Sequence, residues 1–224
     1  AVIVNPSFDS QTKETLTTSK ASFGSKCDIP NTFIDKLFKT AIVDKIIAQS
    51  EFKNNTKLKK TDGKKQKTLL GIPKLSDANK AGTKESKECT LILTEGDSAR
   101  TTAITGLSEV GRDLYGVFPL RGKPLNVKDA DVEKMLKNTE IGNIKTILGL
   151  KTNNVYDTTN ISELRYGKLV IMTDQDVDGS HIKGLIMNIF HSHWKSLLKV
   201  GYISSLLTPI VKVTKHVGKK EKSF

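Results

Sequence analysis

Cysteine is scarce in this chain of 224 residues. Cys27 and Cys89 are the two cysteines, far apart and without a CxxC pair, so the sequence supports neither a disulfide framework nor a zinc site. Cys89 opens an apolar stretch, and we expect it to be a small core residue. A run of 18 apolar residues and a signal peptide are also lacking, which favours a soluble, intracellular protein without a membrane partner.

Basic residues outnumber acidic ones by 36 to 24, and they are unevenly distributed. Residues 1–87 carry 17 basic and 9 acidic residues, a net charge of +8, whereas residues 88–224 carry 19 and 15, a net charge of +4. Six of the eleven residues at 57–67 are lysine. Such a stripe is typical of a protein with a polyanionic partner, DNA or RNA. A solvated lysine-rich loop that only keeps the protein soluble is the alternative.

The first part of the chain predicts a helix followed by a linker. The chain starts with Ala1 and ends on KKEKSF without a stop signal, so we expect a segment of a longer protein. Residues 31–50 carry apolar side chains at helical spacing, and Asn31 can cap this helix. From 51 to 87 the periodicity vanishes, which predicts a linker or flexible loop.

From residue 88 the pattern alternates between strands and helices. Short strands that alternate with helices predict an α/β fold, a mostly parallel sheet with helices on both faces. The expected order is a strand at 89–94, a helix at 98–110, a strand at 115–120, helical segments within 130–149, a strand at 168–173, a helix at 180–199 and a strand at 202–213.

The stretch DQDVDGSHIKGL, residues 174–185, places three aspartates at alternate positions before a glycine. A calcium-binding EF-hand loop begins in this way, but it needs a glutamate at position 12, where this chain has Leu185, and a preceding helix, where it has the strand-like KLVIMT. We instead expect a helix capped by Ser180 to follow. The aspartates then lie between a strand and a helix, where open α/β sheets bind their ligands.

A second polar group, EGDSA at 95–99, ends the first strand of this alternating region. Gly96 would let the backbone turn tightly, and Asp97 or Ser98 would cap the next helix, so Asp97 can be purely structural. Glu95 has no such local role. If the two strands are parallel neighbours, their carboxyl ends share one edge of the sheet and Glu95 faces the aspartates.

We expect the side chains of Asp174, Asp176 and Asp178 to project together, because alternate residues of an extended segment point the same way. Two unit charges about 4 Å apart repel by roughly 4 kcal/mol near a protein surface, so converging carboxylates need a cation. Oxygen ligands without histidine or cysteine select a hard divalent ion, and an open site of this kind suits Mg²⁺. A pair of ions would serve a phosphodiester displacement. The alternative is an acidic strand end that is only solvated.

Basic groups are expected at the same edge. In PLRGKPLNV, Arg121 and Lys123 follow a predicted strand, and Gly122 between them permits the close approach of a ligand; both basic side chains suit backbone phosphates. Two lysines stand before the first strand of the sheet and a histidine follows the acidic loop, and each could equally be ordinary surface charge or packing: Lys74, Lys80 and His181.

EGDSA, PLRGKPLNV and TDQDVDGSHIKGL, in this order, resemble the Toprim domain of type IIA DNA topoisomerases. The amino-acid sequence of the third motif, with IKGL after the histidine, is more similar to that of the eukaryotic type II enzyme than to that of bacterial gyrase. NPSFDSQTKE, residues 5–14, resembles the end of that enzyme's transducer domain, and GIPKLSDANKAG, residues 71–82, resembles the segment that leads into Toprim. Pro124 departs from the aliphatic residue usual in the family, and the lysine-rich stretch at 52–67 is not a family motif.

The resemblance implies roles for individual residues. Glu95 would be the general acid and base at the 3′ oxygen of the scissile phosphate and would hold one Mg²⁺ with Asp174, while Asp176 and Asp178 would support a second ion together with Asp174. Mn²⁺ or Ca²⁺ could substitute. The residues implied in DNA binding are Arg121, Lys123, Asn126, Lys74, Lys80 and His181. In the QTK loop, the matching residues that approach ATP in a separate ATPase domain are Gln11 and Lys13.

The resemblance also implies a domain plan. It has four parts: the end of a transducer domain at 1–55, a lysine-rich linker at 56–87, the Toprim domain at 88–213 and a basic tail at 214–224. The implied partners are double-stranded DNA, a winged-helix domain with the catalytic tyrosine, and a second copy in a homodimer. The implied location is the nucleus or, for a DNA virus, its replication compartment.

The full enzyme would pass one duplex through a transient, magnesium-dependent break in another in an ATP-dependent reaction. The segment itself would cleave nothing, since none of its tyrosines lies in a winged-helix context. Two other hypotheses stay open. One is a Toprim primase or nuclease that needs no distant tyrosine, and the other is a non-catalytic DNA-binding module whose carboxylates hold a structural ion.

Overall fold

A computed structural model of the chain describes residues 3–24, 29–128, 130–207, 214–217 and 220–223. The chain forms two compact units that divide between Phe52 and Lys53. The described part of the first unit contains a short 3-10 helix at Lys20–Ser22, helix α1 at Asn31–Phe38 and most of helix α2 at Ala41–Lys59. The other described elements belong to the second unit.

The single helix predicted at 31–50 is in fact two helices, and its predicted cap is wrong. The N-cap of α1 is Pro30, which makes no side-chain hydrogen bond, so Asn31 lies inside the helix. The break follows Phe38, where the Thr40 hydroxyl donates to the carbonyl of Leu37 at 2.7 Å. Helix α2 then continues to Lys59. The sequence predicts a linker from residue 51 because no apolar stripe marks these residues, and that prediction is wrong as far as Lys59.

Four apolar runs form the sheet of the second unit. They are β1 (Thr90–Thr94), β2 (Tyr115–Pro119), β3 (Lys168–Met172) and β4 (Ile203–Ser205), in the order β2-β1-β3-β4. All three strand pairs are parallel, which confirms the predicted sheet. β4 ends earlier than the strand predicted at 202–213, and residues 208–213 lie outside the described residues.

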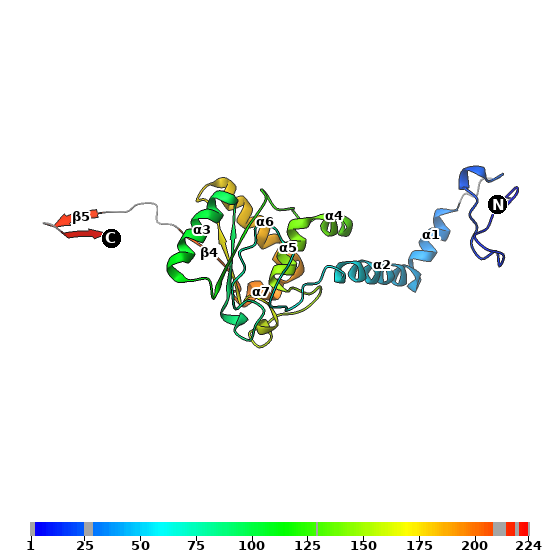
Figure 1. The fold of residues 1–224 in the computed structure, drawn as a ribbon. Coiled ribbons are helices and arrows are strands. Elements are labelled where there is room, and N and C mark those ends of the chain that lie inside the picture. The colour runs from blue at the N-terminus through cyan, green and yellow to red at the C-terminus, as the bar shows by residue number, and fades with distance from the viewer. Residues whose placement is uncertain (1–2, 25–28, 129, 208–213, 218–219, 224) are drawn as a thin grey trace. The chain divides into compact units, whose positions relative to one another are not determined.

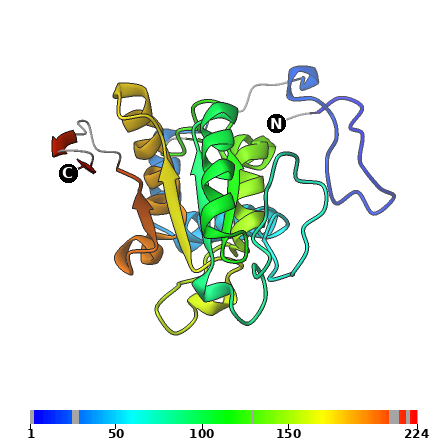
Figure 2. The ribbon, with the colours of Figure 1, turned by 60° about the vertical axis from the view of Figure 1, so that its left-hand side comes forward.

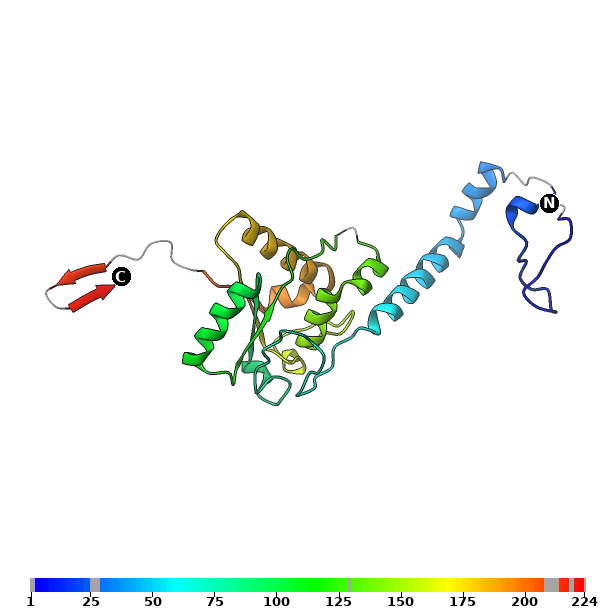
Figure 3. The ribbon, with the colours of Figure 1, turned by 45° about the horizontal axis from the view of Figure 1, so that its top comes forward.

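Helices cover both faces of this sheet, because alternate residues of each strand point to opposite sides. Leu91 and Leu93 of β1 are buried in the main core, to which α4 (Val132–Lys137) and α5 (Thr139–Leu148) contribute. Ile92 packs into a smaller cluster with residues of α3, Asp97–Val110. Figures 1 and 2 show α3 on one side of the strands and α5 and α6 on the other, and Figure 3 gives the same separation from above.

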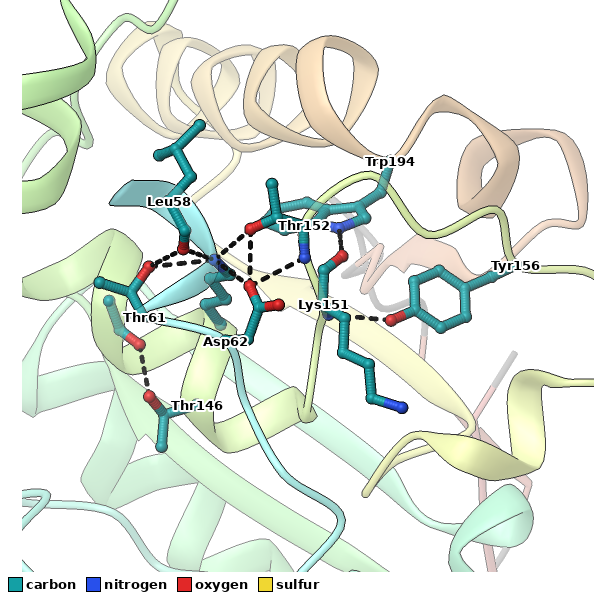
Figure 4. Close-up of polar contacts among 10 residues, drawn as sticks. Leu58, Thr61, Asp62, Thr146, Lys151, Thr152, Tyr156 and Trp194 are labelled. Carbon is teal, nitrogen blue, oxygen red and sulfur yellow. Dashed lines mark hydrogen bonds and ion pairs between the residues drawn. The ribbon is translucent and has the colours of Figure 1, made fainter. Parts of the chain in front are cut away.

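The helix after the third strand starts earlier than predicted and is broken near its end. Helix α6 spans Val177–His193, and its N-cap is Asp176, not Ser180. Helix α7, Lys195–Lys199, follows after Trp194. The indole nitrogen of Trp194 donates to the carbonyl of Lys151 at 2.8 Å, which holds the junction against the loop after α5 (Figure 4).

A buried ion pair joins the end of α2 to α5 (Figure 4). The Nζ of Lys145 lies 2.7 Å from Oδ1 of Asp62 and donates to the carbonyl of Leu58 and the hydroxyls of Thr61 and Thr152 at 2.8–3.0 Å. Burial alone would raise the pKa of Asp62, but hydrogen bonds from Lys145 and Thr152 outweigh it, so the pKa is lowered. A buried charge is tolerated when it is paired in this way.

The segment that leads into β1 is packed against the rest of the second unit, to which it belongs. Arg165 is completely buried and donates to the carbonyl oxygens of Gln66, at 2.7 Å, and Lys67, at 3.3 Å. The same guanidinium forms an ion pair with Asp77, which also accepts a hydrogen bond from the Tyr166 hydroxyl. The sequence predicts a flexible connection here. That prediction missed the anchor because Arg165 lies about 90 residues further along the chain and leaves no signal in the local sequence.

Cys89 has no exposed surface, as predicted for a core residue, and its burial raises the pKa of the thiol. Cys27 lies outside the described residues. None of the described helices is both long enough and apolar enough to cross a membrane. The remaining elements are 3-10 helices at Ser86–Glu88 and Ile161–Glu163, and strands β5 (Thr214–Val217) and β6 (Lys220–Ser223), which pair antiparallel.

Candidate metal centre at the edge of the sheet

The Glu95 carboxylate meets the backbone of Asp174 where the central strands end. The last residue of β1, Thr94, pairs with Met172 of β3, so the next residues of both strands leave the same edge side by side. The backbone N–H of Glu95 donates to the carbonyl of Met172 at 3.2 Å, and the N–H of Asp174 donates to Oε2 of Glu95 at 3.2 Å. The predicted juxtaposition of Glu95 and Asp174 therefore exists.

The other two aspartates have different local partners. Asp176 caps helix α6, since its Oδ1 accepts a hydrogen bond from the N–H of Gly179 at 2.8 Å. Asp178 already belongs to the first turn of α6, so the prediction that all three aspartates project from one extended segment is wrong. The helix begins before the acidic triplet ends, because aspartate is a favourable N-cap residue and Asp176 takes that position.

Gly179 makes the strand-to-helix junction narrow. A Cβ at this position would collide with the carbonyl oxygen of Asp174 and lie 3.0 Å from the Thr173 hydroxyl. The glycine after the third aspartate is thus explained by close packing of the first turn of α6 on the end of β3, and not by a calcium loop. Gly96, by contrast, has an extended backbone that other residues also adopt, so the predicted need for a tight turn there is wrong.

A lysine supplies positive charge to the acidic edge. The Nζ of Lys123 lies 2.8 Å from Oδ1 of Asp178. This hydrogen bond and the Asp178 charge raise the pKa of Lys123, and the charges of Asp176 and Glu95 add to the effect. The ammonium in turn lowers the pKa of Asp178, helped by nearby His181. One carboxylate after β1 and two at the start of α6 therefore favour the charged form of Lys123.

The donor set fits a hard divalent ion, although the side chains are not gathered around one point. Within the described residues, no three acidic, histidine or cysteine side chains converge closely enough to hold an ion in this arrangement. Asp176 is turned to its helix and Asp178 to Lys123. The donors available are nevertheless all carboxylate oxygens, and three of them, from Glu95, Asp176 and Asp178, already stabilise a positive group. Glu95 and Asp174 line one shallow pocket beside the start of α3.

Asp97 is not a helix cap but the partner of Lys74. Helix α3 begins at Asp97 after Gly96, without a side-chain cap from Asp97 or Ser98. The ammonium of Lys74 forms an ion pair with Asp97 and lowers its pKa. Arg100 holds the lysine in place by donating to its carbonyl oxygen at 3.0 Å. Lys74 therefore stands at the predicted edge, and sequence reasoning missed Arg100, which carries no motif.

The loop after β2 is fixed at two points. The N–H of Arg121 donates to the carboxylate of Glu140 in the first turn of α5. Asn126 accepts a hydrogen bond from the side-chain amide of Asn188 on α6 at 2.7 Å. Gly122 between these anchors has a φ of +83°, which favours glycine. Glu140 and Asn188 were not predicted, because nothing in their sequence context marks them.

Pro124 is buried within this loop, so the departure from the family pattern is accommodated by packing. The side chains of Arg121, Lys123 and Asn126 are exposed. His181 is exposed on α6 and lies near enough to Asp178 to affect its pKa. These groups are therefore at the predicted edge and open to a ligand.

Lys80 does not lie at this edge, and its predicted placement there is wrong. Its ammonium pairs with Glu85 at 3.0 Å, and its N–H donates to the carbonyl of Asp113 at 3.0 Å. Both partners precede strands, so Lys80 stands at the amino ends of β1 and β2. The error arose because nearness in sequence to β1 does not specify which end of the strand a residue approaches.

In the first unit, Gln11 and Lys13 lie at the tip of a narrow loop. Phe8 and Leu16 form an antiparallel bridge, and the N–H of Lys13 donates to the carbonyl of Ser10 at 3.1 Å. The Lys13 ammonium lies 5.9 Å from the centre of the Phe8 ring. Gln11 and Lys13 are exposed, so this tip presents them to solvent.

A model of the Toprim domain matches residues 90–205, more than half of the chain. The chain belongs to the Toprim family. Its matched region starts with β1 and ends with β4, so the edge described above is an edge of the Toprim sheet.

Relatives of known name match the whole chain and not only its Toprim domain. DNA topoisomerase 2 of Bombyx mori is 55% identical over 224 residues, which is 100% of this chain and 14% of the relative. Human DNA topoisomerase 2-beta is 52% identical over 225 residues, again 100% of this chain and 14% of the relative. The predicted resemblance to eukaryotic type II topoisomerases is confirmed, and the chain spans about one seventh of these relatives.

A solved structure has a similar fold over most of the chain. The crystal structure of the Plasmodium falciparum topoisomerase II DNA-binding, cleavage and re-ligation domain superposes with a TM-score of 0.65 at 57% identity. The match covers 71% of this chain and 22% of that chain. The Toprim fold of the second unit is thus supported by both sequence and structure.

Proposed function

We propose that this chain is the metal-binding Toprim segment of an ATP-dependent type II DNA topoisomerase, an isomerase that makes and reseals a double-strand break in DNA to pass a second duplex through it. The observation that carries the proposal is the meeting of Glu95 and Asp174 at neighbouring strand ends, in a chain similar along its whole length to DNA topoisomerase 2.

Four carboxylates would hold two Mg²⁺ ions, with Mn²⁺ or Ca²⁺ as substitutes: Glu95, Asp174, Asp176 and Asp178. When bound, Mg²⁺ supplies positive charge to phosphate oxygens during displacement at phosphorus. Support comes from the all-oxygen donor set and from the Lys123 ammonium that three of these carboxylates, Asp178, Asp176 and Glu95, already stabilise.

Glu95 would exchange a proton with the 3′ oxygen at the scissile phosphate. The N–H of Asp174 orients one oxygen of Glu95 and leaves the other open to a substrate. Its half-buried position at the end of β1 restricts the side chain, which suits a group that must meet a single oxygen atom.

Basic groups beside the carboxylates would bind the DNA backbone. Arg121 and Lys123 stand on an anchored loop, and Lys74 and His181 flank it on either side of the edge. Asn126 would also belong to this DNA-binding loop, and its hydrogen bond with Asn188 would hold the loop in position. These side chains suit phosphate oxygens, which carry no sequence information.

The exposed loop tip of the first unit would approach ATP in a separate ATPase domain. Lys13 would reach the γ-phosphate and Gln11 would flank it, since both are presented on a narrow turn. A homodimer, a winged-helix domain and a location in the nucleus complete the proposal, and they follow from the similarity to eukaryotic DNA topoisomerase 2.

The tyrosine nucleophile would come from that winged-helix domain, so the isolated segment would be inactive. Of the four tyrosines in the chain, Tyr156, Tyr166 and Tyr202 are buried, and burial raises the pKa of each. Tyr115 is partly buried against α3. None of these hydroxyls suits attack on a phosphate in solvent.

The test is the substitution Glu95→Gln in the complete protein. We expect DNA cleavage to fall by about 10²- to 10⁴-fold, the contribution typical of general acid–base catalysis, while DNA binding is retained. Glu109→Gln is the matched control, because Glu109 is an exposed glutamate near the far end of α3. Normal cleavage by the Glu95→Gln protein would refute the role of Glu95.

A further inference from the structure

The ion pair between Lys123 and Asp178 joins two groups that the proposed function requires separately. Lys123 is needed for a phosphate of DNA, and Asp178 is needed for a metal ion. In the structure these two side chains satisfy each other at 2.8 Å, with 52% and 59% of their surfaces exposed. Neither has another ion-pair partner among the described residues.

The loop around Lys123 is anchored on both sides, while the Lys123 side chain is exposed and held only by Asp178 among the described residues. Upstream, the N–H of Arg121 is bonded to Glu140, and downstream, Asn126 is bonded to Asn188. The loop therefore has no need to move when Lys123 changes partners. A rotation of one flexible lysine side chain is enough to open the ion pair.

We propose that the Lys123–Asp178 ion pair couples metal binding to DNA binding, so that each ligand favours the other. This inference rests on the proposed function. A phosphate that takes Lys123 releases Asp178 for a divalent cation, and a cation that takes Asp178 releases Lys123 for a phosphate. The free-energy cost of opening the ion pair is met once, by whichever ligand binds first, so the second ligand binds more tightly. The two ligands therefore strengthen each other's binding by the same factor.

The same pair protects the ligand-free protein. Without DNA or metal, Lys123 pairs with Asp178, and its charge is also close enough to Asp176 and Glu95 for both to favour the charged ammonium. Lys123 is thus a counter-ion until a divalent cation replaces it. Because the pair is exposed, we expect its share of the coupling to be about two- to five-fold.

The experiment measures Mn²⁺ affinity of the complete protein by the electron paramagnetic resonance signal of free Mn²⁺, at constant ionic strength and without nucleotide. The coupling factor is the Mn²⁺ dissociation constant without duplex DNA divided by the constant with it. We compare the unmodified protein with Lys123→Gln. Lys128→Gln is the matched control, since it removes one exposed positive charge from the same loop and leaves the ion pair intact.

We expect Lys123→Gln to lower the coupling factor about two- to five-fold and to strengthen Mn²⁺ binding without DNA. Lys128→Gln should leave the coupling factor unchanged. Equal coupling factors for Lys123→Gln and the unmodified protein would overturn the inference while leaving the proposed function standing. Mn²⁺ binding that is insensitive to Glu95→Gln would overturn the metal centre and the inference together.

Discussion

At the edge of the sheet, three of the four chemically similar carboxylates have three different hydrogen-bond partners. Glu95 accepts a hydrogen bond from Asp174, Asp176 caps a helix, and Asp178 pairs with a lysine. A residue type at a fixed spacing therefore predicts the kind of ion but not the task of each side chain. Substitutions must separate a structural task from a ligand task at each position.

Asp176 allows this separation. Asp176→Ala removes the helix cap and should lower the free energy of unfolding by about 1 kcal/mol, whereas Asp176→Asn keeps a cap and should cost only a few tenths. Both substitutions remove a carboxylate and should weaken Mn²⁺ binding alike. Thermal unfolding and Mn²⁺ titration measure the two effects, and equal stability of the two variants would contradict the capping role.

Gly179 tests the packing of the strand-to-helix junction. Gly179→Ala should destabilise the chain by about 2–4 kcal/mol, because the new methyl group meets the carbonyl of Asp174. Gly184→Ala is the control within the same helix, where a Cβ meets open space. It should stabilise by about 0.5–1 kcal/mol. Chemical denaturation checks both, and a tolerated Gly179→Ala would contradict the tight junction.

At the scale of elements, the sequence predicts strands better than helix ends. The runs TLILT and KLVIM lie in β1 and β3 because unbroken apolar residues have few other solutions in a short segment. Helix α2 was cut short in the prediction because its last turns are polar. The meeting of Glu95 and Asp174 was predictable from parallel pairing alone.

The anchors that hold these elements were not predictable. Lys145 and Asp62 lie far apart in sequence, and a surface lysine looks the same in a sequence as a buried one. Arg165 with Asp77 and Arg121 with Glu140 are similar long-range contacts. Such pairs depend on the finished fold, so they carry no local signal.

Lys145→Met tests the anchor between α2 and α5. This substitution should lower the free energy of unfolding by about 3 kcal/mol, because it removes one partner of a largely buried ion pair and leaves the Asp62 charge behind. Lys151→Met is the control, since Lys151 is half exposed and lies 3.5 Å from its partner Glu163. It should change stability by less than about 1 kcal/mol. Equal losses in both variants would contradict the anchor.

The same anchor predicts a pH dependence. The pKa of Asp62 is lowered from 3.8 in the folded chain, so its charged form stabilises the fold above that pH, and this stabilisation is lost as the pH falls through the folded-state pKa. The difference in melting temperature between the unmodified chain and Asp62→Asn should therefore be constant from neutral pH to about 5 and shrink below about 4. A difference that grows on acidification would have the wrong sign.

At the scale of the whole molecule, the chain supplies one half of a proposed reaction centre. Its Toprim sheet gathers carboxylates and basic side chains at one edge, while its tyrosines are occupied in packing. The uneven positive charge, with +8 on residues 1–87, suits a protein that binds a polyanion. DNA topoisomerase 2 of Bombyx mori is about seven times longer than this chain, and we propose that the nucleophile and the ATPase come from corresponding parts outside the chain.

The central claim is that divalent cations bind between Glu95 and the aspartates that follow β3. Anomalous diffraction from crystals of the complete protein with nicked duplex DNA and Mn²⁺ tests it most directly. The account predicts manganese peaks in contact with oxygens of Glu95 and Asp174, with Lys123 turned from Asp178 to a phosphate. Manganese peaks away from Glu95 and Asp174, with the Lys123–Asp178 pair still closed, would contradict it.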